Sequence, residues 1–186
     1  MSACIVCGSK AGTAELLPEY RDAAIGLPLV LRNAAIRHHC PECGMEGVEI
    51  PDMEGLEAAA ALARLLLPVA LSGPDLRFLR KACSLTGKAF AAELGVDAST
   101  LSRWEHATTP DQGAGRQSEI LIRDVVANLL HTRAPAITIP PGTFARMTII
   151  PAPTGPRPEI TMERVRLKDT TTQRKSDAWD VFRAAG

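Results

Sequence analysis

Hydrophobic and polar positions divide the chain into segments of different periodicity. In the first 50 residues, Glu15-Leu16-Leu17 and the apolar run at 29–31 are separated by turn residues, and Leu27-Pro28 marks a bend. This pattern predicts short strands in a small antiparallel sheet. From Met53 to Leu67 apolar residues recur at helical spacing, which predicts a helix over about 52–70 that Pro68 kinks or ends.

Short helices are predicted to follow between Pro74 and Gly95. Apolar residues from Leu76 to Cys83 fall at helical spacing, and Thr86 is suited to cap a second helix that runs to Leu94. Gly95 ends that helix, and Asp97 caps the next one. The sequence therefore predicts a helix, a short turn and another helix.

A further helix is predicted over residues 117–131 because it carries one continuous apolar stripe. The stripe consists of Ile122, Val125, Val126, Leu129 and Leu130. It either closes the core or forms a dimer seam, and we expect a homodimer.

Beyond Arg133 the composition shifts to proline and β-branched residues. Extended segments are predicted at 136–139, 147–150 and 159–167, with a stiff proline-rich loop between the last two. A short helix is predicted from Ser176 to Ala185.

Charge and hydropathy narrow the class of protein only slightly. Formal net charge is zero overall and −4, +1 and +3 for residues 1–72, 73–133 and 134–186, which does not by itself indicate nucleic-acid binding. The most apolar stretch, residues 58–71, contains Arg64 and Pro68 and is too short to cross a bilayer. Because the N-terminus carries no export or lipidation signal, we expect a cytoplasmic location.

Two Cys-x-x-Cys pairs carry the clearest chemistry, Cys4 with Cys7 and Cys40 with Cys43. Each pair precedes a glycine, and two such turns supply the four thiolates of one tetrahedral structural zinc site per chain. Disulfides are less favoured without a secretory signal, and a thioredoxin-type pair would occur once.

Other cysteine and histidine residues are assigned different roles. Cys83 lies on the inner face of its predicted helix and is expected to be a small core residue. His38 and His39 precede Cys40, and replacement of a sulfur ligand by one of them is the alternative to four cysteines.

The segment from Leu85 to Glu105 resembles the helix-turn-helix of phage-repressor-like (Xre) regulators. The matching features are Phe90-Ala91, Leu94-Gly95-Val96, Asp97, Thr100-Leu101-Ser102 and Trp104-Glu105. The pattern places Phe90, Leu94, Val96, Leu101 and Trp104 inward. It places Ala98, Ser99, Ser102, Arg103 and His106 outward.

The resemblance implies a role for each outward residue. Ala98, Ser99 and Arg103 take positions that face base edges, and Arg103 is suited to a bidentate contact with guanine. Thr86 and Lys88 take positions that contact phosphate. Arg80 and Glu105 match a structural ion pair between helices, whereas Gly87 stands where these regulators commonly have glutamine.

The combination of the cysteine turns and the helix-turn-helix resembles the MqsA-type (YgiT-like) antitoxins over residues 1–133. Cys40-Pro41-Glu42-Cys43-Gly44 reproduces their second zinc turn. The resemblance implies a dimeric repressor of its own operon that binds a palindromic operator in double-stranded DNA and a toxin protein that cleaves messenger RNA.

We therefore expect an α+β multidomain protein that is not an enzyme. The predicted parts are a zinc-binding β domain at 1–51, a connecting helix at 52–72, an all-α helix-turn-helix domain at 73–133 and an extended or β C-terminal extension at 134–186. A stand-alone regulator or a protein-interaction module without DNA binding are the alternatives. A zinc enzyme is disfavoured because four thiolates leave no open coordination position.

Overall fold

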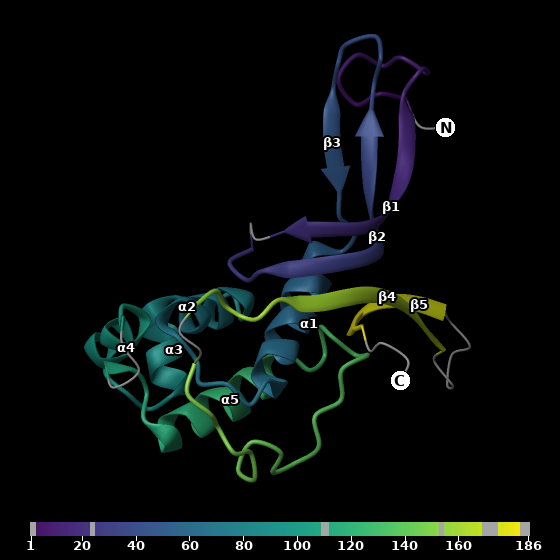
Figure 1. The fold of residues 1–186 in the computed structure, drawn as a ribbon. Coiled ribbons are helices and arrows are strands. Elements are labelled where there is room, and N and C mark those ends of the chain that lie inside the picture. The colour runs from purple at the N-terminus through teal and green to yellow at the C-terminus, as the bar shows by residue number, and fades with distance from the viewer. Residues whose placement is uncertain (1–2, 23–24, 109–111, 153–154, 169–174, 183–186) are drawn as a thin grey trace.

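The computed structural model describes residues 3–22, 25–108, 112–152, 155–168 and 175–182. Its elements in chain order are β1 (Thr13–Asp22), β2 (Leu29–His39), β3 (Glu46–Glu49), α1 (Met53–Leu66), α2 (Gly73–Ala82), α3 (Gly87–Glu93), α4 (Ala98–Glu105), α5 (Arg116–Leu130), β4 (Ile160–Lys168) and β5 (Lys175–Val181). Figure 1 shows a sheet on one side of α1 and the α2–α5 cluster on the other. Among the described residues, none of the helices has the length and apolarity to cross a membrane.

Strands from both ends of the chain form one sheet. β1 pairs antiparallel with β2 from Thr13 opposite His39 to Asp22 opposite Leu29, and β3 pairs with β2 near the cysteine turns. β4 pairs parallel with the first residues of β2, and β5 pairs antiparallel with β4. The α+β layout agrees with the expected fold class, and residues 160–168 and 175–181 continue the N-terminal sheet.

The β1–β2 hairpin changes direction partway along its length (Figure 1). The β1–β2 register shifts between Leu17 and Glu19, and Asn33 on β2 has a left-handed backbone with φ of 47°. Pro18 cannot donate a hydrogen bond to the ladder, so an irregularity at this position is expected. The corner separates the cysteine turns from the part of the sheet that packs on α1.

α1 packs within the interior of the protein, between the sheet and the helical cluster. Its residues from Ala58 to Leu65 are all buried, since the sheet covers one side and the helices cover the other. Small alanine side chains let both neighbours approach closely. α1 ends at Leu66, two residues before Pro68, as the proline predicts.

The C-terminal hairpin fastens the start of α1. Trp179 on β5 is 1% exposed, and its indole Nε1 donates to the carbonyls of Pro51 and Asp52 at 3.2 and 3.1 Å. Arg164 on β4 pairs with the Asp52 carboxylate at 3.1 Å and stacks over the Trp179 ring. Trp179, whose role the sequence pattern does not predict, thus links the last strand to the first helix.

The prediction of a helix from Ser176 is wrong for the described residues, since 175–181 form β5. Pairing with β4 satisfies the backbone of this segment while burying Ala178 and Trp179, and this tertiary gain overrides local propensity. Residues 183–186 lie outside the described residues. The segments 136–139 and 147–150 form no strands, although Ile150 makes an isolated bridge with Val69.

A buried arginine on α5 organises the connection between α1 and α2. The Arg123 guanidinium is 0% exposed and donates to the carbonyls of Leu65, Leu67 (3.0 Å) and Val69 (2.8 Å). It also pairs with Glu119 at 2.7 Å. The last carbonyls of a helix have no hydrogen-bond partner within the helix. The Arg123 side chain supplies donors to carbonyls that would otherwise be buried without one.

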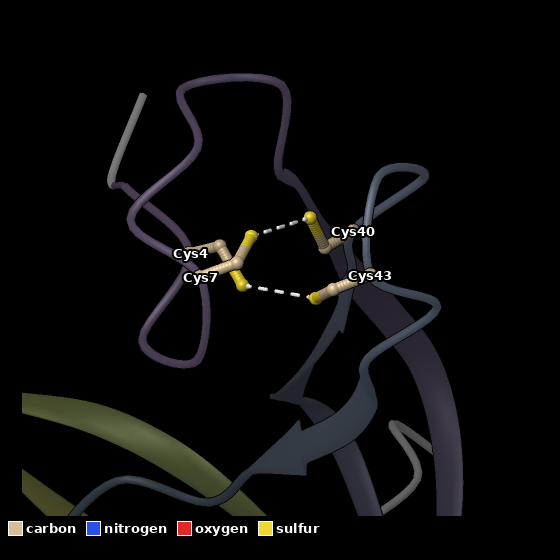
Figure 2. A group of neighbouring side chains, drawn as sticks. All are labelled: Cys4, Cys7, Cys40 and Cys43. Atoms are coloured by element: carbon tan, nitrogen blue, oxygen red, sulfur yellow. Dashed lines mark hydrogen bonds between the residues drawn. The ribbon is translucent and has the colours of Figure 1, made fainter.

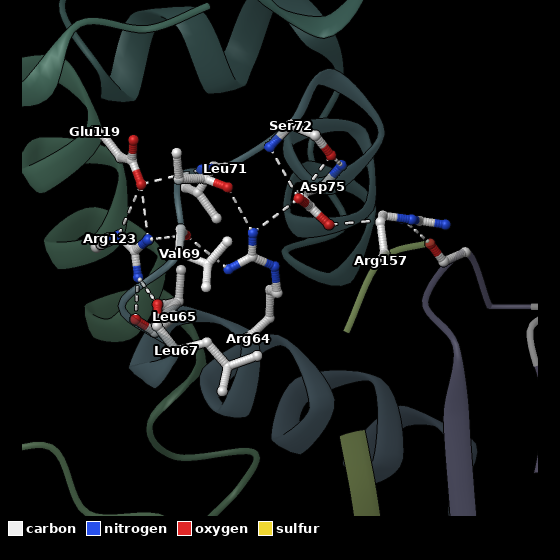
Figure 3. A network of polar contacts seen from close by, with 12 residues as sticks. Arg64, Leu65, Leu67, Val69, Leu71, Ser72, Asp75, Glu119, Arg123 and Arg157 are labelled. Carbon is white, nitrogen blue, oxygen red and sulfur yellow. Dashed lines mark hydrogen bonds and ion pairs between the residues drawn. The ribbon is translucent and has the colours of Figure 1, made fainter. Parts of the chain in front are cut away.

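Arg64 of α1 forms the second half of this network (Figure 3). It donates to the carbonyls of Val69 and Ala70 at 3.1 and 2.8 Å and pairs with Asp75 at 2.9 Å. Asp75 also accepts from Ser72 in the capping box that begins α2. The network therefore fixes how α1 enters the helical cluster.

Candidate functional site

The four cysteines lie in two turns of matching geometry at one end of the sheet. The Gly8 N–H donates to the Cys4 carbonyl and the Gly44 N–H to the Cys40 carbonyl, each at 2.9 Å. Both glycines have positive φ, 73° and 69°, which a side chain would disfavour. β1–β2 pairing at Thr13 opposite His39 brings the two turns together.

The sulfur atoms have the spacing of a tetrahedral metal site (Figure 2). The Sγ atoms of Cys4 and Cys43 lie 3.7 Å apart, as do those of Cys7 and Cys40, and all four fall within 4.8 Å of one another. Zn–S bonds of about 2.3 Å in a tetrahedron place sulfurs about 3.8 Å apart. The cluster is therefore able to hold a metal ion.

Electrostatics within the cluster also favour a bound cation. Backbone N–H groups of Cys7 and Val6 lower the pKa of Cys4 to about 6. The Ser9 N–H lowers the pKa of Cys7, but the Cys43 sulfur, burial and the other sulfurs outweigh it and raise that pKa to about 12. Four close sulfurs do not all ionise on their own, and a divalent cation supplies the missing positive charge.

The nearby histidines pair with glutamates, and the fifth cysteine packs against the hydrophobic core. His38 Nε2 lies 2.8 Å from a Glu49 oxygen and His39 Nδ1 lies 3.5 Å from a Glu46 oxygen, both across the β2–β3 pair. Cys83 is half-buried, and its burial raises the pKa of its thiol to about 11. Within the described part of the chain, the group suited to a metal contains the four cysteines alone.

The second predicted site lies on the helix-turn-helix, in α3 and α4. The Thr86 hydroxyl accepts from the Ala89 N–H at 3.2 Å and caps α3, and Gly95 ends it with φ of 64°. Asp97 stands at the N-cap position of α4, although its side chain makes no capping hydrogen bond. The inward residues are buried or half-buried as predicted: Phe90, Leu94, Val96, Leu101 and Trp104.

All seven residues predicted to contact DNA are exposed. They are Thr86, Lys88, Ala98, Ser99, Ser102, Arg103 and His106. Five of them lie on α4 or at its end, and three of these five, Ala98, Ser99 and Ser102, have small side chains. Arg103 makes no hydrogen bond or ion pair to other described residues, so its guanidinium is available to a partner.

The predicted ion pair between helices is confirmed. Arg80 of α2 donates to both carboxylate oxygens of Glu105 at 2.6 and 3.1 Å, and Glu105 is 6% exposed. A β-carbon at Gly73 would lie 2.5 Å from the Glu105 carbonyl oxygen, so glycine permits the close approach of α2 to the end of α4. These contacts hold α4 in place.

The apolar stripe of α5 has two parts. Ile122, Val126 and Leu130 are 0% exposed and close the core, as the alternative interpretation held. Leu129 is 39% exposed, and Leu121, which is not among the predicted stripe residues, is 44% exposed. Leu121 lies four residues before the half-buried Val125 and eight before Leu129, a helical spacing that would have identified it.

Sequence reasoning also missed the buried charged network. The sequence signal for it was a charged residue among apolar ones. Arg64 interrupts the apolar stretch 58–71, and Arg123 lies next to Ile122 on the buried face of α5. Charged residues are seldom fully buried unless they are paired.

Comparison with known families identifies the helical region. A helix-turn-helix family model matches residues 76–113, roughly a fifth of the chain, which contains α3, α4 and most of α2. No curated protein and no solved structure matches the chain. The helix-turn-helix domain supports a DNA-binding regulator, and the resemblance to MqsA-type antitoxins stays a prediction.

Proposed function

We propose that this chain is a sequence-specific DNA-binding transcription regulator in which α4 enters the major groove. The match of residues 76–113 to the helix-turn-helix family, together with the exposed outer face of α4, carries this proposal. The Arg80–Glu105 pair supports α4 from behind, which leaves its outer face free for base edges.

The residue types on this face suit direct readout. Ala98 and Ser99 are small and permit close approach, and Arg103 carries the donors for guanine O6 and N7. Thr86 and Lys88 lie at the start of α3, where contacts to phosphate position the protein without reading sequence.

The DNA-bound form is proposed to be a homodimer. Leu121, Val125 and Leu129 form an apolar ridge on the outer side of α5. A two-fold seam along this ridge removes apolar surface from water and presents two copies of α4. The operator is then a palindrome with half-sites about one helical turn apart.

The metal is proposed to be a structural zinc ion held by Cys4, Cys7, Cys40 and Cys43. Four thiolates close the tetrahedron, so the ion stabilises the turn geometry and takes no part in catalysis. The chain is accordingly proposed to be a regulator and not an enzyme.

Antitoxin activity is the second part of the proposal, and one observation favours it. Four large apolar side chains are exposed in the first cysteine turn and on β1 and β3: Ile5 (91%), Val6 (67%), Leu16 (55%) and Val48 (39%). Figure 1 shows β3 far from α4. A hollow of about 820 Å³ lies beside the first turn and β3. Such a surface suits a protein partner, here a toxin, while α4 remains on DNA.

Two experiments test these parts separately. Fluorescence anisotropy with the DNA upstream of the chain's own gene should show binding that exceeds that of a shuffled duplex and weakens steeply with salt. Equal affinity for both duplexes would favour the interaction-module alternative. For the antitoxin part, the expected toxin is the product of the gene next to this one. Coexpression of this chain should relieve the growth arrest that the toxin causes. Ile5→Glu should abolish that relief while leaving the anisotropy of DNA binding unchanged.

A further inference from the structure

A groove of about 550 Å³ lies between α5 and the segment that follows this helix. One side is a face of α5 and its C-cap residue, with Asp124, Ala127, Asn128 and His131. The other side is formed by residues between Pro135 and Gly142, and the buried side chains of Leu62 and Phe144 add apolar surface. The volume lies within the range of ligand pockets, and the apolar ridge proposed for the dimer lies outside these walls.

Backbone groups without a partner line the side of the groove opposite α5. The sequence predicts an extended segment at 136–139, and this segment pairs with no strand of the described sheet. In Figure 1 it belongs to the green connection that leads from α5 to β4. The Ile137 N–H donates to the Ala134 carbonyl at 3.1 Å, but the N–H and C=O groups of Thr138 and Ile139 have no hydrogen-bond partner among the described residues. Because backbone groups are rarely buried without a partner, these groups face water or a ligand.

Asp124 adds a negative charge on the α5 side of the groove. It is half-buried and makes no hydrogen bond or ion pair within the described part of the chain, and both carboxylate oxygens keep accessible surface. Neighbouring groups that carry or can gain positive charge have other contacts: His131 Nδ1 lies 2.7 Å from the Asn128 carbonyl oxygen, and Arg146 Nη2 donates to the Pro141 carbonyl at 3.3 Å. The groove therefore holds a carboxylate that lacks a cationic partner in the described chain.

We propose that this groove binds an extended peptide segment of another protein that carries a lysine or arginine side chain. The peptide backbone pairs with the N–H and C=O of Thr138 as an added strand, and the basic side chain forms a charge-assisted hydrogen bond with Asp124. A second, apolar side chain of the peptide packs against Ala127 and Phe144. An acidic peptide is repelled by Asp124, and an uncharged peptide leaves this carboxylate unpaired.

Selection of random heptapeptides displayed on phage, against the full-length, metal-loaded protein, tests the charge requirement. Enriched peptides should share a lysine or arginine with β-branched or aromatic neighbours. The strongest binder, synthesised with acetylated and amidated ends, should bind Asp124→Asn at least about tenfold more weakly than the wild type, because the ion pair is lost. Glu93→Gln, at an exposed carboxylate of α3 outside the groove, should bind this peptide as the wild type does.

Loss of a backbone donor tests the strand pairing. Thr138→Pro removes the N–H and should abolish peptide binding, whereas Thr138→Ala keeps the N–H and should retain binding. N-methylation of the peptide bonds one at a time removes donors without altering the protein, and at least one methylated peptide should lose binding.

Four outcomes would overturn the proposal. They are failure to enrich basic peptides, wild-type affinity in either Asp124→Asn or Thr138→Pro, full binding of every methylated peptide, and a peptide-free dimer that Asp124→Asn dissociates in sedimentation. The last outcome would assign the groove to a second copy of this chain.

Discussion

Arg123→Met should destabilise the fold strongly, although it lies on a helix that does not touch the proposed DNA face. The arginine is fully buried, pairs with Glu119 and donates to three backbone carbonyls of the α1–α2 connection. Burial lowers the pKa of Arg123 and the Glu119 contacts oppose that effect, so the side chain depends on its partners. Methionine preserves length and apolar volume but supplies no donor.

The expected magnitude follows from the charge left behind. Removing one partner of a buried ion pair costs about 3–5 kcal/mol, because the other charge stays buried. At about 2–4 °C per kcal/mol for a chain of this size, the melting temperature should fall by roughly 6–20 °C. Glu119 would keep only the Leu71 N–H, at 3.1 Å, among its described hydrogen-bond donors.

Thermal unfolding followed by circular dichroism measures this effect. Arg116→Met provides the matched control, since Arg116 is exposed on the same helix and should change stability by less than about 1 kcal/mol. The double variant Arg123→Met with Glu119→Leu should be less destabilised than the sum of the single variants. If Arg123→Met melts within about 2 °C of the wild type, the network does not support the fold as described.

Three further predictions concern the metal, the C-terminal hairpin and acid stability. Chelation or Cys43→Ser should unfold the cysteine turns while leaving α2–α5 folded. Proton–nitrogen NMR spectra with and without zinc measure this, and unchanged spectra after complete metal removal would contradict a structural metal. Trp179→Ala should lower the free energy of unfolding by about 3–5 kcal/mol, because it opens a cavity over the start of α1 and leaves two carbonyls without their donor. Phe182→Ala, at a half-buried ring, should lower it less in the same urea titration, and equal losses would argue against the role of Trp179. Burial raises the pKa of Asp75, but the Arg64 charge and the hydrogen bonds from Ser72 and Arg64 hold that pKa below its ordinary value of 3.8. The Asp75 carboxylate therefore stabilises the fold above pH 3.8, and this stability is lost as pH falls through the lowered pKa. Below about pH 4 the urea midpoint should drop less for Asp75→Asn than for the wild type, and parallel pH curves would count against this.

The cysteine cluster and the helix-turn-helix were predictable because both are encoded locally. Two residues between Cys4 and Cys7, followed by Gly8, already specify a turn that directs two sulfurs to one side. Within α3 and α4, the spacing of Phe90 and Leu101 together with the stop at Gly95 determines which face is buried. These features need no knowledge of the rest of the chain.

The remaining features depend on contacts between distant segments. β4 pairs with β2 from Leu29 opposite Ile160, more than a hundred residues apart, and no local pattern records that pairing. The strand at 175–181 follows from it, because β5 forms only where β4 offers an edge. Arg123 likewise reaches the carbonyls of the α1–α2 connection, and charge on an apolar face indicated its burial without naming its partners.

Selection from a random-sequence duplex pool tests the proposed DNA recognition most directly. Full-length protein should enrich one palindromic sequence with half-sites about one helical turn apart, and Arg103→Ala should lose about 1–3 kcal/mol on that sequence while its binding to random duplex is nearly unchanged. Arg37→Ala, which removes an exposed arginine of β2, should behave as the wild type. Failure to enrich any sequence, or equal losses for Arg103→Ala on selected and random DNA, would contradict base recognition by α4.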